Sequence, residues 1–207
     1  MAMDVNSADK WEADYLRGSD GWDLGAPTPA FRNLLANGQL SPGRMLVVCA
    51  GRGHDAREFA RHGYQVTAVD FSPYAAREMS RLSEPGTPME ILQQDLFSLP
   101  HELDGQFDYI LEYTCYCAID PKRRTEFVDL ITRLLKPEGL YISLAFPLAQ
   151  KQGGPPFAVT VSELLQLFQE RGFKLVEREQ PSNSVPQRRG AEELLMFQKS
   201  TSLQSSH

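Results

Sequence analysis

Short apolar runs alternate with amphipathic segments along most of the chain, from Met45 onward. The apolar runs are rich in Val, Ile and Leu, which is typical of buried β-strands. Seven strands are expected, at Arg44–Cys49, Gln65–Asp70, Met89–Gln93, Phe107–Glu112, Leu140–Ala145, Lys174–Glu179 and Glu193–Lys199. Helical periodicity between them predicts helices at about His54–His62, Pro73–Leu82, Pro121–Leu135 and Val161–Arg171. This alternation predicts an α/β fold with a doubly wound, mostly parallel sheet.

The first forty residues follow a different pattern. They predict a helix from about Asp9 to Arg17, a loop punctuated by Gly and Pro from Gly18 to Pro29, and a second helix from Ala30 to Gly38. Two caps are also expected: Ser72 before Pro73, and Ser162 at the start of a later helix. We expect the amino-terminal segment to cover the edge of the sheet.

A length of 207 residues suits one hydrophobic core, and 42% hydrophobic with 23% charged residues is ordinary globular composition. We therefore expect a single domain, divided into a helical cover at 1–40, an α/β core at 41–199 and a frayed polar tail at 200–207.

The net charge of -6 comes without a basic stripe, so nucleic acid is not expected as a partner. The longest apolar run, Met45–Ala50, is too short to cross a membrane, and the amino terminus has neither the basic start nor the apolar core of a secretory signal. We expect a cytoplasmic protein, monomeric or weakly dimeric, that binds no membrane.

The cysteines, Cys49, Cys115 and Cys117, are odd in number and form no CxxC motif. The four histidines show no HxxxH or HExxH spacing. These patterns argue against a disulfide framework and against a zinc site, so reduced thiols and no metal centre are expected.

A glycine turn, Gly51-Arg52-Gly53, leads from the first predicted strand into a helix. Such a turn lets the backbone approach a nucleotide-like ligand. Asp70 ends the second predicted strand, where a carboxylate can accept both hydroxyls of a ribose. Asp95 follows the third strand and Glu112 ends the fourth, so four features should meet at one edge of the sheet.

Two other classes of protein fit this turn. Gly51-x-Gly53-x-x-Ala56 matches the dinucleotide fingerprint of an NAD-dependent oxidoreductase, with Asp70 as its ribose acid. Such an enzyme normally has a further substrate domain. The oxidoreductase interpretation also does not explain why an acid, Asp95, follows the third strand. A non-catalytic ligand-binding module on the same fold is the other alternative.

Further motifs span almost the whole chain. They are Trp11-x-x-x-Tyr15 with Trp22, the run Val48–Asp55, the run Tyr113–Pro121 and the run Gly153–Phe157. In these segments the chain resembles class I S-adenosylmethionine-dependent methyltransferases, and more closely the thiopurine methyltransferase superfamily with its plant-type thiol and halide methyltransferases. The resemblance implies a Rossmann-like fold and S-adenosylmethionine as cofactor. It also implies a small soft acceptor: a thiol, a thiopurine-like thiol, a halide or thiocyanate.

The resemblance also assigns roles around the cofactor. Asp70 would hold the ribose, Asp95 with Leu96 would frame the adenine, and the main chain near Cys49 and Gly51 would approach the methionine moiety. Aromatic side chains at the amino terminus would form a cover, since aromatic faces attract a sulfonium cation as they do other onium groups. The expected cofactor-binding residues are Trp11, Tyr15, Trp22, Cys49, Gly51, Gly53, Asp70, Asp95, Leu96 and Glu112.

The acceptor is expected between the stretch 113–119 and the Pro155-Pro156-Phe157 segment, with Tyr113, Tyr116 and Phe157 in contact with it. Soft anions need no general base, so no catalytic residue is expected beyond those that position the reactants and exclude water.

The chain departs from the family pattern at four positions. The family usually has glycine where this chain has Cys49, cysteine in place of Ala50, tryptophan in place of Tyr15 and aspartate in place of Glu112. A side chain at position 49 is expected to crowd the cofactor.

Overall fold

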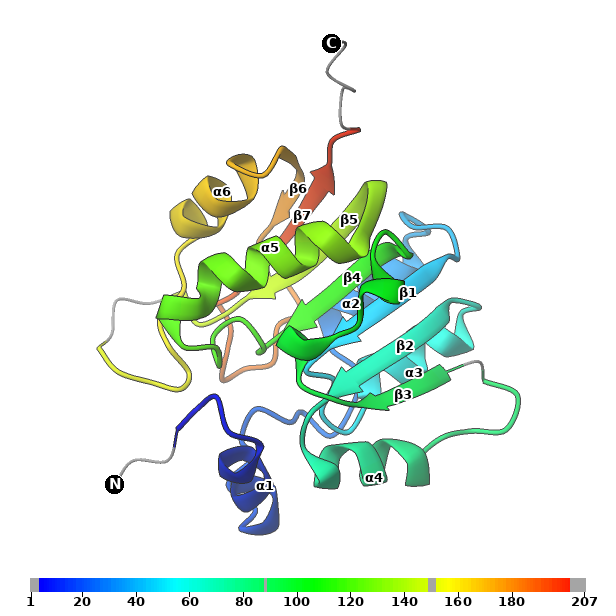
Figure 1. Cartoon of the computed structure of the whole chain (residues 1–207), viewed down its shortest axis with the longest axis vertical. Coiled ribbons are helices and arrows are strands. Elements are labelled where there is room, and N and C mark those ends of the chain that lie inside the picture. The colour runs from blue at the N-terminus through cyan, green and yellow to red at the C-terminus, as the bar shows by residue number, and fades with distance from the viewer. Residues whose placement is uncertain (1–3, 88, 149–151, 202–207) are drawn as a thin grey trace.

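The computed structural model describes residues 4–87, 89–148 and 152–201, so most of the expected tail lies outside the described residues. Within them a seven-stranded sheet has the order β3-β2-β1-β4-β5-β7-β6 (Figure 1). The first five strands are parallel, and β7 is antiparallel to both of its neighbours. The strands are β1 Arg44–Val48, β2 Gln65–Asp70, β3 Met89–Gln93, β4 Phe107–Tyr113, β5 Leu135–Ala145, β6 Phe173–Glu179 and β7 Glu193–Lys199.

Helices cover both faces of this sheet, because successive strand residues point to opposite sides. Leu46 and Val48 of β1 pack into the core beneath α5 and α6, whereas Met45 and Val47 pack toward α2, α3 and α4. Figure 1 shows α5 and α6 in front of the sheet and α2 and α3 behind it. The helices are α1 Ala8–Leu16, α2 Pro29–Ala36, α3 His54–Arg61, α4 Pro73–Arg81, α5 Arg124–Leu134 and α6 Val161–Gln169.

All seven expected strands are confirmed, and only β5 departs from its expected start by more than one residue. It begins at Leu135, directly after α5, and Leu135 pairs with Phe107 across an irregular register. The expected helix Pro121–Leu135 is confirmed except at its start, where a 3-10 turn over Pro121–Arg123 precedes α5. The pairing of Leu135 with Phe107 sets the start of β5, and helical periodicity does not reveal such a long-range contact.

The expected cap at Ser72 is confirmed, and the one at Ser162 is wrong. The Ser72 hydroxyl accepts from the Ala75 N–H at 3.2 Å, so α4 begins at Pro73 immediately after β2. Thr160 caps α6 instead, and its hydroxyl accepts from the Glu163 N–H at 3.2 Å.

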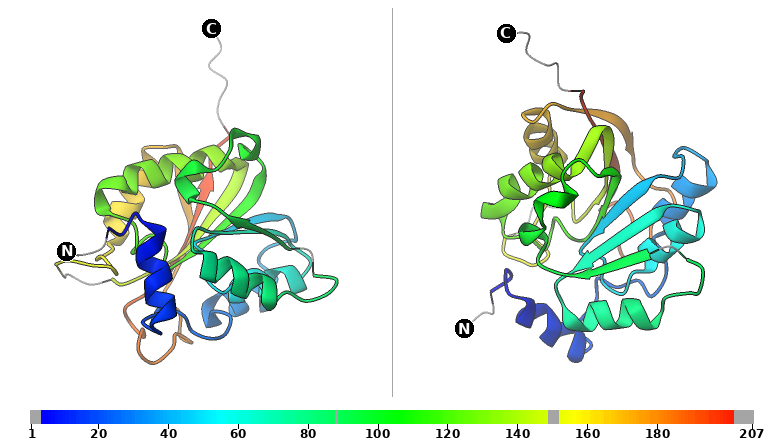
Figure 2. Two further views of the ribbon diagram at one scale, coloured as in Figure 1. Left: turned by 60° about the horizontal axis from the view of Figure 1, so that its bottom comes forward. Right: turned by 45° about the vertical axis from the view of Figure 1, so that its right-hand side comes forward.

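The two amino-terminal helices differ in their surroundings. Helix α1 lies beyond the carboxyl ends of the strands and packs on α4 (Figures 1 and 2). Its Glu12 accepts from the Ser72 hydroxyl and the Tyr74 N–H, both at 2.7 Å. Helix α2 instead buries Phe31 and Leu34 in the core, so only the first part of the segment 1–40 lies over the sheet edge. None of the helices within the described ranges is long and apolar enough to cross a bilayer.

Candidate active site

A cavity of about 450 Å³ lies at the carboxyl edge of the sheet, a volume typical of small-molecule sites. Residues at the ends of five parallel strands line it: Cys49 after β1, Asp70 in β2, Asp95 after β3, Thr114 after β4 and Phe146 after β5. Seven of the expected cofactor-binding residues line this cavity, namely Trp11, Tyr15, Trp22, Cys49, Asp70, Asp95 and Leu96.

Two backbone N–H groups hold the Asp70 carboxylate in place. It is only 8% exposed, and its two carboxylate oxygens accept from the N–H groups of Gly51 and Ser72, each at 2.9 Å. Burial raises the pKa of Asp70 to about 6, although these N–H groups lower it. Each oxygen keeps a second lone pair, so the carboxylate can still accept hydrogen bonds from a sugar diol in the cavity.

Gly51 lies directly beside Asp70, with φ of 55°. A Cβ added there would come within 3.1 Å of the Tyr15 hydroxyl. Glycine is therefore needed both for the backbone conformation and for the close approach of the cover.

The β3 side of the cavity is apolar, with one acid at its rim. Asp95 accepts a hydrogen bond from the Phe97 N–H through its Oδ1 atom at 3.0 Å. Its Oδ2 atom takes no part in that hydrogen bond. Leu96 is buried, and the Phe97 ring lies 3.6 Å from the Arg123 guanidinium. Apolar walls with a carboxylate acceptor at the edge suit a flat purine that carries an amino group.

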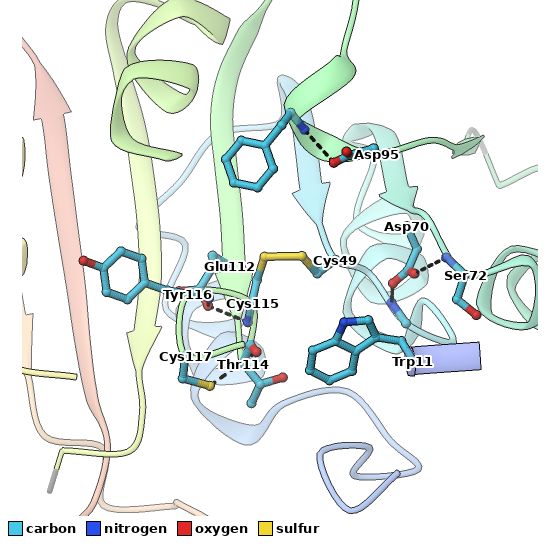
Figure 3. Close-up of a disulfide and its surroundings, with 12 residues drawn as sticks. Trp11, Cys49, Asp70, Ser72, Asp95, Glu112, Thr114, Cys115, Tyr116 and Cys117 are labelled. Carbon is cyan, nitrogen blue, oxygen red and sulfur yellow. Dashed lines mark hydrogen bonds between the residues drawn. A yellow bond between two sulfur atoms is a disulfide. The ribbon is translucent and has the colours of Figure 1, made fainter. Parts of the chain in front are cut away.

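Aromatic side chains from the amino terminus form the opposite wall. Trp22 meets Trp11 and Tyr15 edge to face, with 5.3 Å between ring centroids in each pair. Figure 3 shows the Trp11 ring between Asp70 and the turn after β4 that carries Thr114, and both Trp11 and Asp70 line the cavity. Such faces provide the negative quadrupole that attracts a cation. Together with Asp70 and the apolar wall beside Asp95, they fit a sulfonium nucleoside.

Ion pairs fasten the loop that carries Trp22. Arg52, from the glycine turn, pairs with Asp20 at 2.6 Å and with Asp23. Burial by itself raises the pKa of Asp23, but hydrogen bonds from His54, the Gly25 N–H and Arg52 outweigh it and lower the pKa. The cover is therefore attached to the residues that approach the cofactor.

The cysteines differ from expectation, because Cys49 and Cys115 form a disulfide (Figure 3). They are 66 residues apart in sequence, yet β1 and β4 are neighbours and Val48 pairs with Glu112. The Cα atoms of the two cysteines are consequently 5.5 Å apart. Cys117 is a buried free thiol, as expected, and burial raises its pKa to about 12.

Glu112 and Gly53 lie outside the cavity lining and support it. The Glu112 carboxylate, 2% exposed, accepts from the N–H groups of Cys115 and Tyr116 at 2.8 Å and from the Ser143 hydroxyl at 2.6 Å. It therefore anchors the turn after β4. Gly53 is the amino-terminal cap of α3, and a Cβ there would meet Met79 at 2.5 Å.

The expected acceptor residues Tyr113, Tyr116 and Phe157 also lie outside the lining of this cavity. The Tyr116 ring packs on Phe127 with 5.7 Å between centroids, and Phe157 packs beneath Gly154. Tyr113 donates to Glu192 at 2.6 Å. In their place the wall consists of Cys117, Ala118, Ile119, Phe146, Pro155 and Pro156.

Sequence reasoning missed Arg188, which reaches the cavity from the loop before β7. It is 6% exposed, and its Nη2 donates to the carbonyls of Gly21 at 3.2 Å and Trp22 at 2.8 Å. Its guanidinium carbon lies 5.1 Å from the Tyr113 ring and 5.0 Å from the Phe146 ring. Buried Nη1 has no hydrogen-bond partner, and no carboxylate within the described ranges forms a salt bridge with Arg188. No local sequence signal marks it.

Residues 6–205 match the family model described as thiopurine S-methyltransferase (TPMT). The chain belongs to the thiopurine S-methyltransferase family. Probable thiol methyltransferase 2 of Arabidopsis thaliana is 34% identical over 207 residues, which covers 99% of this chain and 91% of that protein. Thiocyanate methyltransferase 1 of the same plant is also 34% identical, over 91% of this chain and 84% of its own.

Solved structures support the fold of this family member. Burkholderia thailandensis 1,6-didemethyltoxoflavin-N1-methyltransferase, with bound S-adenosylhomocysteine, superposes with a TM-score of 0.73 at 22% identity, over 94% of this chain and 87% of that one. The protein is an S-adenosylmethionine-dependent methyltransferase with a Rossmann-like fold. The oxidoreductase and the non-catalytic module are not favoured.

Proposed function

We propose that this methyltransferase acts on a small soft anion, namely a thiolate, a thiopurine-like thiolate, thiocyanate or a halide. The observation that carries the proposal is the buried guanidinium of Arg188 at the cavity wall, whose Nη1 amino group is unpaired within the described residues. A buried cation without a carboxylate partner favours an anionic ligand. The relatives named as thiol and thiocyanate methyltransferases support the same acceptor class.

The cofactor side of the cavity consists of Asp70, Asp95 with Leu96, and the aromatic cover. When bound, S-adenosylmethionine supplies an electrophilic methyl group on its sulfonium sulfur. Asp70 would hold the ribose hydroxyls, and Leu96 with Asp95 the adenine. Trp11, Tyr15 and Trp22 would face the sulfonium and keep water away from it.

The acceptor side consists of Arg188 and the apolar wall of Phe146, Pro155 and Pro156. Arg188 would orient the anion, and the wall would remove its hydration shell. An acceptor that is already an anion loses no proton when it is methylated. The residues on this side therefore act by positioning and by water exclusion, which can supply a large part of the rate enhancement.

A panel of acceptors tests the proposal. Hydrosulfide, thiocyanate, iodide, an aromatic thiol and a thiopurine are each incubated with methyl-labelled donor, with a neutral amine and a catechol as controls. We expect methylated product from the soft anions and none from the controls. Methylation of the amine or the catechol alone would contradict the proposed acceptor class.

We also propose that the protein is cytoplasmic, is a monomer or weak homodimer, and binds neither nucleic acid nor membrane. The net charge of -6 supports the absence of a nucleic-acid partner. Sedimentation at several protein concentrations tests the oligomeric state. A stable higher oligomer would contradict this prediction.

A further inference from the structure

The Cys49–Cys115 disulfide lies in the lining of the cavity, between the Asp70 side and the acceptor side (Figure 3). Its two halves differ in exposure: Cys49 is exposed, whereas Cys115 is 1% exposed. Cys49 is therefore the more accessible half of the disulfide.

The bond connects the two segments between which the cofactor would pass. Cys49 precedes the glycine turn that holds Asp70, and Cys115 follows Thr114 in the turn anchored by Glu112. Both Cys49 and Thr114 have positive φ, 48° and 63°. The bond thus lies in the lining of the cavity and joins the backbone segments that follow β1 and β4.

We propose that Cys49–Cys115 is a thiol–disulfide exchange site, through which small thiols convert the cavity from a bonded form that binds the cofactor weakly to a reduced form that binds it tightly. This inference rests on the proposed function, because it places the methionine part of the cofactor beside Cys49. In the reduced form the Cys49 side chain is free to rotate away from Cys115. The lining of the cavity then opens at this point.

The exchange proceeds in two balanced steps. A thiolate of a small thiol attacks the Cys49 sulfur, so a mixed disulfide forms, the Cys49–Cys115 bond breaks, and Cys115 leaves as a thiolate that takes up a proton. A second small thiolate attacks the mixed disulfide and releases Cys49 as a thiolate. Two small thiols are oxidised to one small disulfide, and the protein disulfide is reduced to two thiols. A small disulfide drives the reverse reaction.

Cys117 takes no part in the exchange, although it lies two residues from Cys115. Its sulfur donates to the Thr114 carbonyl at 3.3 Å, and burial holds its thiol in the protonated form. Only a thiolate attacks a disulfide effectively. Cys117 also belongs to the cavity wall, so Cys117→Ser is judged only by the ratio of affinities between the two redox states, which it should leave unchanged.

The test measures S-adenosylhomocysteine binding by calorimetry to protein equilibrated with oxidised or with reduced glutathione, with thiols counted in each sample. We expect one free thiol and weak binding in the oxidised sample, and three free thiols with at least tenfold tighter binding in the reduced sample. Cys49→Ser and Cys115→Ser should bind equally in both buffers. Cys117→Ser should keep the tenfold ratio.

Equal affinity of the two parent samples, or three free thiols after oxidation, would overturn the switch while leaving the proposed function intact. Absence of binding in both samples would also overturn it. If binding depends on the redox state but the reduced protein methylates none of the soft anions, the proposed function fails and the exchange site stands.

Discussion

The two sides of the cavity are built in different ways. On the cofactor side, Asp70 and Asp95 each accept an N–H from a residue two positions further along the chain, Ser72 and Phe97. On the acceptor side, Arg188 is held by the carbonyl of Trp22, 166 residues away. Local backbone geometry fixes the first side, whereas long-range packing fixes the second.

This difference explains why a family can keep one cofactor and vary its acceptor. An acid at the end of a parallel strand needs only the strand and the following turn to be positioned. An arginine on a loop depends on distant parts of the fold for its position, and loops vary more readily than the strand ends that carry the acids. The Cys49–Cys115 bond links the two sides, and the predictions below test each in turn.

Reduction of the Cys49–Cys115 disulfide, which links the two sides, should change the free energy more than any other alteration proposed here. Reduction of the disulfide should lower the free energy of unfolding by about 2–4 kcal/mol, because the bond closes a long loop in the unfolded chain. Urea denaturation with and without a reducing agent measures this difference. Cys117→Ser should retain the full difference and Cys115→Ser should lose it. An unchanged midpoint for the reduced parent would contradict the prediction.

On the cofactor side, Asp70→Ala should weaken S-adenosylhomocysteine binding to the reduced protein by about 1.5–3 kcal/mol, the range for hydrogen bonds to a charged group. Asp95→Ala should weaken binding by less than Asp70→Ala does, since Asp95 lies at the rim of the cavity and is more exposed than Asp70. Calorimetry on both variants gives the comparison, and circular dichroism checks that they fold. Parent-like binding by Asp70→Ala would remove Asp70 from the site.

On the acceptor side, Arg188→Met should raise KM for an anionic acceptor by an amount equivalent to about 1.5–2 kcal/mol. S-adenosylhomocysteine affinity should fall less than the affinity for the acceptor, because Arg188 reaches the cofactor side only through the Gly21 and Trp22 carbonyls that it holds. Arg189→Met, at the exposed neighbouring position, is the matched control. If both variants behave alike in steady-state kinetics, Arg188 has no role in acceptor binding.

The smallest expected effect is on pH dependence. Because burial raises the pKa of Asp70 to about 6, its ionised, fully accepting form is lost as the pH falls. Affinity for S-adenosylhomocysteine should be about tenfold lower at pH 5 than at pH 7, equivalent to about 1.4 kcal/mol. Asp70→Asn should abolish this dependence.

Asp55 provides the control, since burial also raises its pKa to about 6, while its carboxylate accepts from Thr28 on the far side of the glycine turn. Asp55→Asn should keep the pH dependence of binding. For stability the sign is opposite to that of a salt-bridged acid. Both carboxyls bind a proton more tightly in the folded state than in the unfolded state. Their contribution to the free energy of unfolding therefore decreases as the pH rises from about 4 to about 6, and it is constant at higher pH. Urea titrations of the parent and of Asp55→Asn isolate this contribution, and a difference in stability that rises with pH over that interval would contradict it.

The strands, the α/β class and the gathering of Asp70 and Asp95 at one cavity could be predicted from the sequence alone. Each of these depends on residues that are close in the chain: the apolar runs, the glycine turn, and the acids that end β2 and follow β3. Side-chain alternation and strand direction then bring Asp70 and Asp95 to one edge of the sheet without further information.

The opposite wall of the cavity could not be predicted from the sequence, because it depends on long-range packing. The pairing of β1 with β4 brought Cys49 to Cys115, which contradicts the expectation of reduced thiols at these two positions. Packing on α5 drew Tyr116 into the core, and the loop before β7 delivered Arg188. These placements depend on contacts between residues far apart in the chain. The physical reason is that sequence spacing carries no record of which distant segments become neighbours once the sheet forms.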